Sequence, residues 1–294
     1  EALAAISFAF PMVFLLISLG MGLSVAGSVL VAQHAGAGEE AQAGYAASQT
    51  VTFALVAAVV LGVGGYFLVG PALSILGASD AVLPGATAYM QIISLGLVAM
   101  FGFWVFVSLM RGYGDTVTPM LVMLGSVVLN IALDPFVIFG WGPFPRLGIV
   151  GAAYATVFSR ALALLVGLGI MLSGSRGVQI RPSQMVPDRE YARRILDIGL
   201  PASVEMTGRA VSVNLLLFVV GLFPTTVVAA FGIGTRVFSV IFLPAIAVAR
   251  GVETMTGQNI GAGKPDRAAE AARTAAIAMF VVLSLAGVVA FVGA

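Results

Sequence analysis

The sequence predicts an all-α, polytopic membrane protein, and three observations support this fold class. Hydrophobic residues make up 60% of the 294 residues, whereas Asp, Glu, Lys and Arg together make up 9%. A soluble domain carries about 25% charged residues, so this chain lacks the charge to cover a water-facing surface. The mean hydropathy is +1.08, and long apolar stretches recur along the chain. Lipid must therefore be the solvent for much of this protein.

Apolar stretches long enough to cross a bilayer as a helix, which takes about 20 residues, follow one another along the whole chain. Gly and Pro residues mark the gaps between them, as expected for turns. The eight predicted spans are 3–33, 49–70, 85–110, 117–139, 149–172, 195–221, 228–257 and 274–293.

Lys and Arg residues in the connections predict the orientation. Nine of them lie in the connections after the first, third, fifth and seventh stretches, and Arg146 is alone in the others. The positive-inside rule makes the first set cytoplasmic. We therefore expect a multi-pass protein of the cell membrane with the Gly36–Gly38 and Gly261–Gly263 turns on the cytoplasmic side.

An internal repeat predicts two related halves. Gln33–Gly38, read as Gln-His-Ala-Gly-Ala-Gly, returns 225 residues later as Gln-Asn-Ile-Gly-Ala-Gly. Each copy follows one span and leads into the next, which favours a true repeat over a common turn. We expect two pseudo-twofold-related helical bundles, with this chain supplying eight of twelve spans. The predicted divisions are an N-terminal bundle at 1–175, a cytoplasmic linker at 176–194 and the start of a C-terminal bundle at 195–294.

Six segments together resemble the multidrug and toxic compound extrusion (MATE) family, nearer its DinF-like branch. They are Gln33–Gly38, Arg111–Pro119, Asn130–Pro135, Gly151–Thr156, Gly199–Pro201 and Gln258–Gly263. The resemblance implies that the eight stretches are helices two to nine of twelve, without helix one and the last three. It also implies a secondary transporter that exports organic cations, drugs or toxic metabolites by antiport with Na⁺ or H⁺ through alternating access.

Asn130 and Asp134 are candidate ligands for the coupling ion. They are four residues apart on the fourth stretch, so their side chains share a helix face. A carboxylate inside a span is costly and indicates function. Pro135 cannot donate to the carbonyl of Ile131, which frees a backbone oxygen on the same turn. Together these groups suit a hard cation or a proton; the alternative is a carboxylate that caps the helix end.

The resemblance to the MATE family assigns the same residues to a known site. It implies that Asn130, Asp134 and Thr156 form the Na⁺ or H⁺ coupling site of the N-terminal half. No other cofactor is expected.

A second group of residues is predicted to line a substrate cavity. Glu205 and Arg209 are four apart on the sixth stretch, where they form either an internal ion pair or part of a cavity wall. Met206, Met100 and Trp104 add surfaces that can adapt to varied ligands, although ordinary core packing also explains them. Arg160 and Arg236 are expected to face the bundle interior.

Several functional classes are excluded or disfavoured. The chain has no cysteine and one histidine, and Pro265 follows the Gly263-Lys264 pair, so thiolate chemistry and a phosphate-binding loop are absent. We expect no enzymatic activity, no nucleic-acid partner at a net charge of +1, and a monomer that contacts lipid and a small, cationic organic substrate. The alternatives are a lipid-linked saccharide flippase, for which Arg160, Arg209 and Arg236 would supply a cationic cavity, and a receptor or scaffold.

Overall fold

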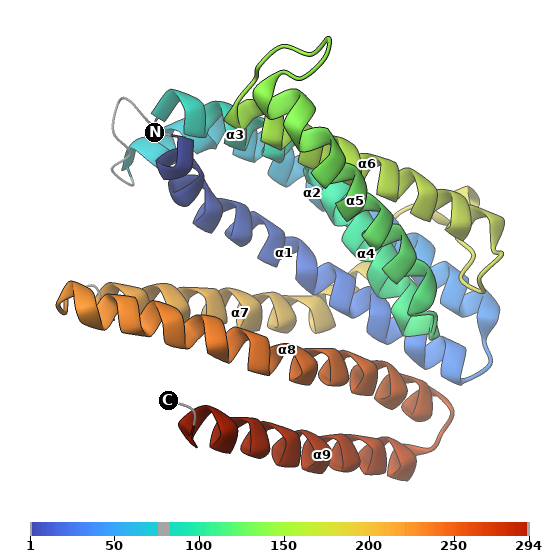
Figure 1. Cartoon of the computed structure of the whole chain (residues 1–294). Helices are drawn as coiled ribbons and strands as arrows, with labels where there is room; N and C mark the ends of the chain where they lie inside the picture. Colours follow the sequence, from blue (N-terminus) through green and yellow to red (C-terminus); the bar gives the residue numbers. More distant parts are fainter. Residues whose placement is uncertain (1, 76–82, 221, 293–294) are drawn as a thin grey trace. The chain divides into compact units, whose positions relative to one another are not determined.

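The computed structural model describes residues 2–75, 83–220 and 222–292, and these ranges are almost entirely helical (Figure 1). This confirms the predicted helical fold class, and helices cover the eight predicted stretches in order. The helices of the described ranges are α1 (Ala2–Gly36), α2 (Glu40–Ile75), α3 (Leu83–Leu95), α4 (Leu97–Tyr113), α5 (Val117–Phe139), α6 (Ile149–Ser173), the 3-10 helix η1 (Pro182–Gln184), α7 (Arg189–Val220), α8 (Thr225–Gly261) and α9 (Pro265–Val292).

Among the described residues, five helices are long and apolar enough to cross a membrane. They are α2, α5, α6, α9 and the segment Ala230–Gly261 of α8. The pair α3 and α4 passes the same test when taken together, which raises the number to six. The chain is therefore a polytopic membrane protein by length and composition of its helices.

The third predicted span is bent, which the sequence did not indicate. α3 and α4 meet at an angle of 50° around Gly96. A Cβ atom at Gly96 would overlap the side chain of Val157 on α6, so only glycine lets α6 approach this close. Backbone hydrogen bonds continue across the bend, from Gly96 to Ile92 at 2.9 Å and from Met100 to Gly96 at 3.1 Å.

The chain folds into two compact units. The first contains Glu1–Val31 and Glu40–Thr207, and the second contains Ala32–Glu39 and Gly208–Ala294. The core of the first unit gathers side chains from α1, α2, α4, α6 and the start of α7. Its largest fully buried members include Phe103, Phe106, Leu109, Met110, Met171, Ile180 and Ile195.

The connection between α6 and α7, residues 174–188, is packed against α2. Val178 and Ile180 are each 1% exposed and belong to the core of the first unit. The backbone N–H of Arg181 donates to Ser48 Oγ at 3.1 Å. A Cβ atom at Gly44 would lie 2.6 Å from the carbonyl oxygen of Gln179, so the two backbones are in close contact. The segment predicted as a linker is thus a fixed part of the first unit as far as α7.

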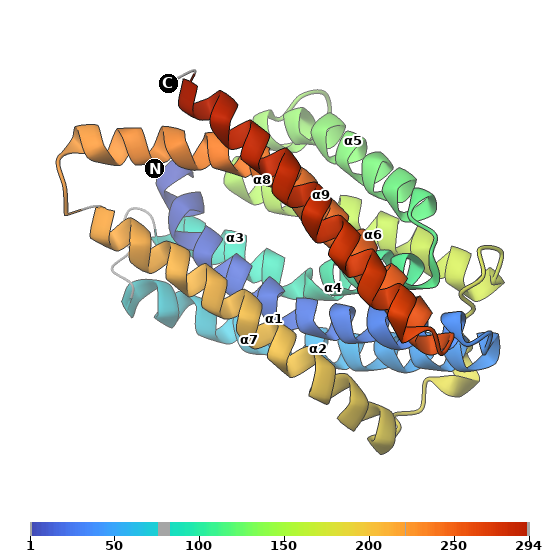
Figure 2. The ribbon, with the colours of Figure 1, turned by 90° about the horizontal axis from the view of Figure 1, so that it is seen from below.

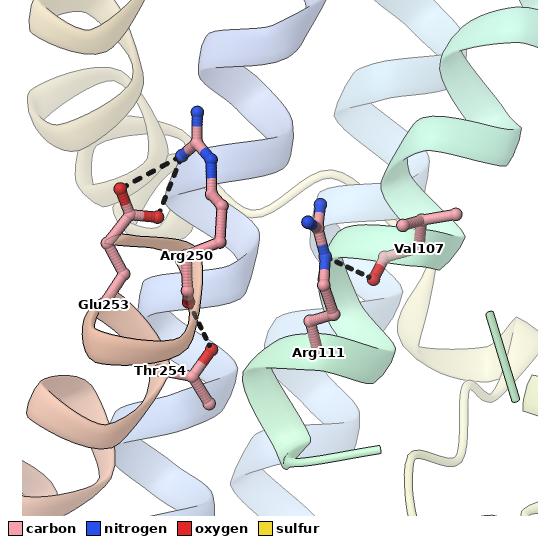
Figure 3. Close-up of polar contacts among 5 residues, drawn as sticks. All are labelled: Val107, Arg111, Arg250, Glu253 and Thr254. Carbon is pink, nitrogen blue, oxygen red and sulfur yellow. Dashed lines mark hydrogen bonds and ion pairs between the residues drawn. The ribbon is translucent and has the colours of Figure 1, made fainter. Parts of the chain in front are cut away.

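In the second unit, α8 and α9 form an antiparallel hairpin, and both views show α9 running back along α8 (Figures 1 and 2). Two arginines, one in each unit, contact partners on their own helices (Figure 3). Arg250 on α8 donates to both carboxylate oxygens of Glu253, at 3.1 and 2.8 Å. Arg111 on α4 donates from Nε to the carbonyl of Val107 at 3.3 Å.

Candidate cation-coupling site

Asn130 and Asp134 lie on the face of α5 that packs against neighbouring helices. Ser126, one turn earlier on the same face, is 5% exposed, and both Asn130 and Asp134 are partly buried. Val128 and Ile131, on the other side of the helix, are 58% and 65% exposed. Residues four apart share a face at 3.6 residues per turn, so the carboxylate and the amide are directed into the helix bundle.

Two contacts fix the register between α5 and the antiparallel helix α6, which lie side by side in both views (Figures 1 and 2). Near the middle of the pair, the hydroxyl of Ser126 donates to the carbonyl of Ser159 at 3.1 Å. Near the other end, Gly151 lies against the carbonyl of Val137, where a Cβ atom would overlap the oxygen. Small residues allow such close approach of helices in membranes.

Thr156 lies at the same level as Asn130, because it falls between these two contacts in the antiparallel register. Its hydroxyl donates to the carbonyl of Ala152 at 2.9 Å. The single hydroxyl proton is therefore used in this hydrogen bond. The Thr156 oxygen keeps lone pairs that can accept a hydrogen bond or coordinate a cation. The register thus places Asn130 and Thr156 at one level of the seam between α5 and α6, with Asp134 one turn further along α5.

Two polar atoms at this seam are buried without a protein partner. Among the described residues, Asn130 Nδ2 and Asp134 Oδ1 make no hydrogen bond. A buried polar group left unsatisfied costs about 1–3 kcal/mol, and native structures contain few of them. Rotating the Asn130 amide by half a turn presents its carbonyl oxygen at the same place. An amide oxygen beside a carboxylate oxygen is a ligand set that suits a hard cation.

Pro135 adds a further acceptor at the outer end of the seam. α5 continues through Pro135 to Phe139, and Gly140 ends it in the left-handed region at φ 76°. Because proline has no N–H, the carbonyl of Ile131 loses its normal helical donor. The freed oxygen lies on the turn that carries Asp134, where it can help hold a cation or let the helix bend.

Arg160 and Ser126 form a polar contact one turn deeper than Asn130. The guanidinium lies 5.1 Å from the ring centre of Phe103 on α4, and Nη1 is 3.5 Å from Ser126 Oγ. Arg160 faces the bundle interior as expected. Ser126 was not predicted, although its position four residues before Asn130 and eight before Asp134 was a readable signal.

The predicted cavity residues are not gathered at this seam. Met100 is 9% exposed and packs in an apolar cluster with Leu97 and Phe101, while Trp104 lies beside Phe103 at 6.3 Å between ring centres. Glu205 and Arg209 are exposed on α7, with Met206 partly buried between them. The boundary between the two compact units falls after Thr207, so Glu205 and Met206 belong to the first unit with the cation site and Arg209 belongs to the second.

The MatE family model matches residues 1–136 and 201–294. These two segments lie on either side of the connection between α6 and α7. The chain therefore belongs to the MATE family, and it is a multi-pass protein of the cell membrane.

Relatives with curated descriptions agree with this assignment. The chain is 32% identical over 270 residues to the probable multidrug resistance protein YoeA of Bacillus subtilis, which covers 91% of this chain and 58% of that protein. It is 31% identical over 271 residues to the FAD transporter of Shewanella oneidensis, which covers 92% of this chain and 60% of that protein. The chain thus spans about 60% of the length of these relatives.

Solved structures show the same fold. A crystal structure of MATE in the bent conformation matches with a TM-score of 0.87 at 26% identity, over 96% of this chain and 62% of that one. A MOP superfamily transporter from Pyrococcus furiosus matches with a TM-score of 0.80 at 28% identity, over 95% of this chain and 62% of that one. That transporter is described as having a binding pocket of reverse polarity that suggests a different function.

Proposed function

We propose that this chain is part of a secondary active transporter that exports small organic solutes, organic cations among them, in exchange for Na⁺ or H⁺. The observation that carries the proposal is the pair of buried, unpartnered atoms on Asn130 and Asp134. Both sit on α5, which is long and apolar enough to cross a membrane, and Thr156 lies level with Asn130 on the neighbouring helix α6. A site that is costly when empty becomes favourable when a cation binds there.

The coupling follows from electrostatics and linkage. An inward-moving monovalent cation releases about 2.3 kcal/mol per 100 mV of membrane potential, in addition to its concentration term. That energy drives export only if ion and solute favour different conformations of one protein. A cation at Asp134 neutralises the carboxylate and engages the oxygen freed at Pro135. It therefore changes the preferred bend of α5 where the solute would otherwise be stabilised.

The remaining properties belong to the same proposal. The protein acts as a monomer in contact with lipid, and it needs no covalent chemistry and no cofactor apart from the coupling ion. The Gly36–Gly38 and Gly261–Gly263 turns lie in the cytoplasm. The names of the curated relatives, several of which are multidrug resistance or multidrug export proteins, support an organic substrate.

The test is a counterflow experiment with the full-length protein in liposomes, in which Na⁺ and pH gradients are imposed separately. We expect one gradient to drive uptake or release of a cationic dye, and no movement when both gradients are collapsed. If neither gradient moves any of a set of cationic, zwitterionic and anionic amphiphiles, the proposed function is wrong.

A second candidate is export or flipping of a solute that carries phosphate groups. Arg160 favours it, because its half-buried guanidinium has no carboxylate partner among the described residues. The FAD transporter relative and the Pyrococcus furiosus transporter with reverse pocket polarity point in the same direction. Arg160→Gln and Arg160→Lys separate the candidates in the same liposomes. Loss of anionic-solute transport in Arg160→Gln but not in Arg160→Lys supports the second candidate, and unchanged cationic-dye export in both supports the first.

A further inference from the structure

The first copy of the repeated Gly-Ala-Gly motif ends α1 in a specific cap. The N–H of Glu39 donates to the carbonyl of His34 at 2.9 Å, and the N–H of Gly38 donates to that of Ala35 at 3.1 Å. Gly38 itself has φ 76°. This pair of hydrogen bonds with a left-handed glycine is the Schellman motif.

The second copy, at the end of α8, has the same backbone. The N–H of Lys264 donates to the carbonyl of Asn259 at 2.8 Å, the N–H of Gly263 donates to that of Ile260 at 3.0 Å, and Gly263 has φ 68°. Every donor and acceptor is 225 positions after its counterpart in the first copy. The repeat seen in the sequence is therefore also a repeat of local structure.

The two copies pack on each other through a reciprocal glycine contact, and both sides of it belong to the second compact unit. A Cβ atom on Gly36 would overlap the carbonyl oxygen of Gln258. A Cβ atom on Gly261 would overlap the carbonyl oxygen of Gln33. In each glycine a hydrogen takes that direction, so two Cα–H groups point at two carbonyl oxygens across the contact. No other residue type fits at either position.

The contact can separate without leaving a backbone group unsatisfied. Gln33 O already accepts a hydrogen bond from Ala37 N at 3.0 Å, and Gln258 O accepts one from Ala262 N at 2.9 Å. Ala37 and Ala262, which follow the two glycines, are exposed. A contact that closes tightly, and that keeps these backbone hydrogen bonds when it opens, suits a moving part better than a permanent one.

We infer that the reciprocal contact between Gly36 and Gly261 is a cytoplasmic gate, which closes when the two repeats meet and opens once in each transport cycle. The inference rests on the proposed transport function and on the predicted cytoplasmic side of both turns. Alternating access requires contacts on one side of the membrane to break when that side opens. The geometry assigns that part to these two glycines, because a side chain at either one would overlap the backbone of the other copy and hold the ends of α1 and α8 apart.

Cross-linking tests whether the contact must open. The chain contains no cysteine, so Ala37→Cys and Ala262→Cys place single thiols one residue after each glycine. The full-length double variant is reacted in liposomes with either a short, rigid or a long, flexible bis-maleimide. We expect the short cross-link to stop gradient-driven transport and the long one to leave it running. Single variants that carry the same reagents should also transport. Transport at the unmodified rate with the short cross-link in place would overturn the inference.

Substitution tests whether the glycines set the closed contact. Gly36→Ala and Gly261→Ala overpack the closed contact. The free-energy cost of overpacking shifts the equilibrium from the closed to the open form by about tenfold or more. A cysteine placed by Gln33→Cys reports on opening, because it lies at the contact. In the Gly36→Ala and Gly261→Ala backgrounds it should react faster with a membrane-impermeant maleimide applied from the cytoplasmic side. The control is Gly251→Ala on α8, where an added Cβ meets nothing within 4 Å. Equal labelling in all three backgrounds contradicts the inference.

These outcomes are separable from failure of the proposed function. If the unmodified full-length protein moves no solute under either gradient, the transport proposal is wrong, and the inference of a gate is then wrong as well. If it transports, and the short cross-link or the alanine substitutions change nothing, only the gate is wrong.

Discussion

Gln49 on α2 donates a hydrogen bond of 2.6 Å from its side-chain nitrogen to the carbonyl of Gln184 in the connection between α6 and α7. The same nitrogen donates to the carbonyl of Val186 at 2.8 Å, and the side-chain oxygen accepts from the N–H of Asp188 at 3.1 Å. Gln49 is 0% exposed. One buried amide therefore satisfies three backbone groups of a segment more than 130 residues away.

Replacing this amide should release the connection from α2. Gln49→Met keeps the volume but leaves three backbone groups without a partner, at about 1–3 kcal/mol for each that stays buried. We expect the free energy of unfolding to fall by about 3 kcal/mol, which is measured as a lower melting temperature in detergent. Gln91→Met is the control, because Gln91 makes a single hydrogen bond of 3.4 Å to Tyr66 O. Similar losses in both variants would show that Gln49 does not anchor the connection.

Low pH should weaken a second hydrogen bond between α2 and the connection from α6 to α7. Tyr45 OH donates to Asp188 Oδ2 at 2.8 Å, and this hydrogen bond lowers the pKa of Asp188. A carboxyl whose pKa is lower in the folded state adds stability above its unfolded pKa, about 3.9, and loses it as pH falls through the folded pKa. Tyr45→Phe should therefore lower the melting temperature near neutral pH and by less below about pH 4.

The matched control for this pH effect is Tyr66→Phe, which removes a hydroxyl from the same helix; within the described part of the chain, that hydroxyl makes no hydrogen bond to a carboxylate. The difference in melting temperature between Tyr66→Phe and the unmodified protein should not change with pH. A Tyr45→Phe difference that stays constant from neutral to pH 3 would contradict the role given to Asp188.

The close packing of α5 on α6 should be sensitive to one methyl group. A Cβ at Gly151 would overlap the carbonyl of Val137, whereas a Cβ at Gly169 on the same helix meets nothing within 4 Å. Gly151→Ala should destabilise the protein by about 1–3 kcal/mol, as overpacking does. It should also weaken ion dependence, because it separates Thr156 from Asn130. Gly169→Ala should leave both the melting temperature and the ion dependence of transport nearly unchanged.

Charge at Asp134 should be essential for coupling. Asp134→Asn keeps the size and polarity of the side chain but cannot neutralise a cation, so gradient-driven efflux from loaded vesicles should be lost while the protein still inserts and binds solute. Asn130→Ala removes a neutral ligand and should raise the ion concentration needed for half-maximal transport by about tenfold, equivalent to one hydrogen bond to a charged group. Export by Asp134→Asn at the unmodified rate would place coupling elsewhere in the protein.

The sequence alone determined the features that depend on local periodicity and composition. The excess of apolar residues, with 9% charged, predicted the membrane class, and the apolar stretches predicted the helices in their order. The separation of four residues placed Asn130 and Asp134 on one face, because a helix has 3.6 residues per turn wherever it occurs. The Gly-Ala-Gly repeat likewise predicted two equivalent turns, since a left-handed C-cap needs glycine whatever surrounds it.

Only the tertiary structure decided which segments meet. The register that brings Thr156 level with Asn130 depends on Gly151 against Val137 and on Ser126 with Ser159, and neither contact has a signature in the spacing of either helix. The bend at Gly96 depends on the approach of α6, and the fixed connection before α7 depends on a glutamine far away in the chain.

The contact between Gly36 and Gly261 shows most clearly which features the sequence determines and which depend on the tertiary structure. The sequence marked Gly36 and Gly261 as equivalent because local backbone chemistry repeats. It could not show that each lies against the backbone of the other copy, because nothing in residues 33–38 specifies what approaches them. Local conformation is a property of neighbouring residues and is readable from them. Long-range pairing is settled by how whole helix faces pack, and it appears only when every helix is in place.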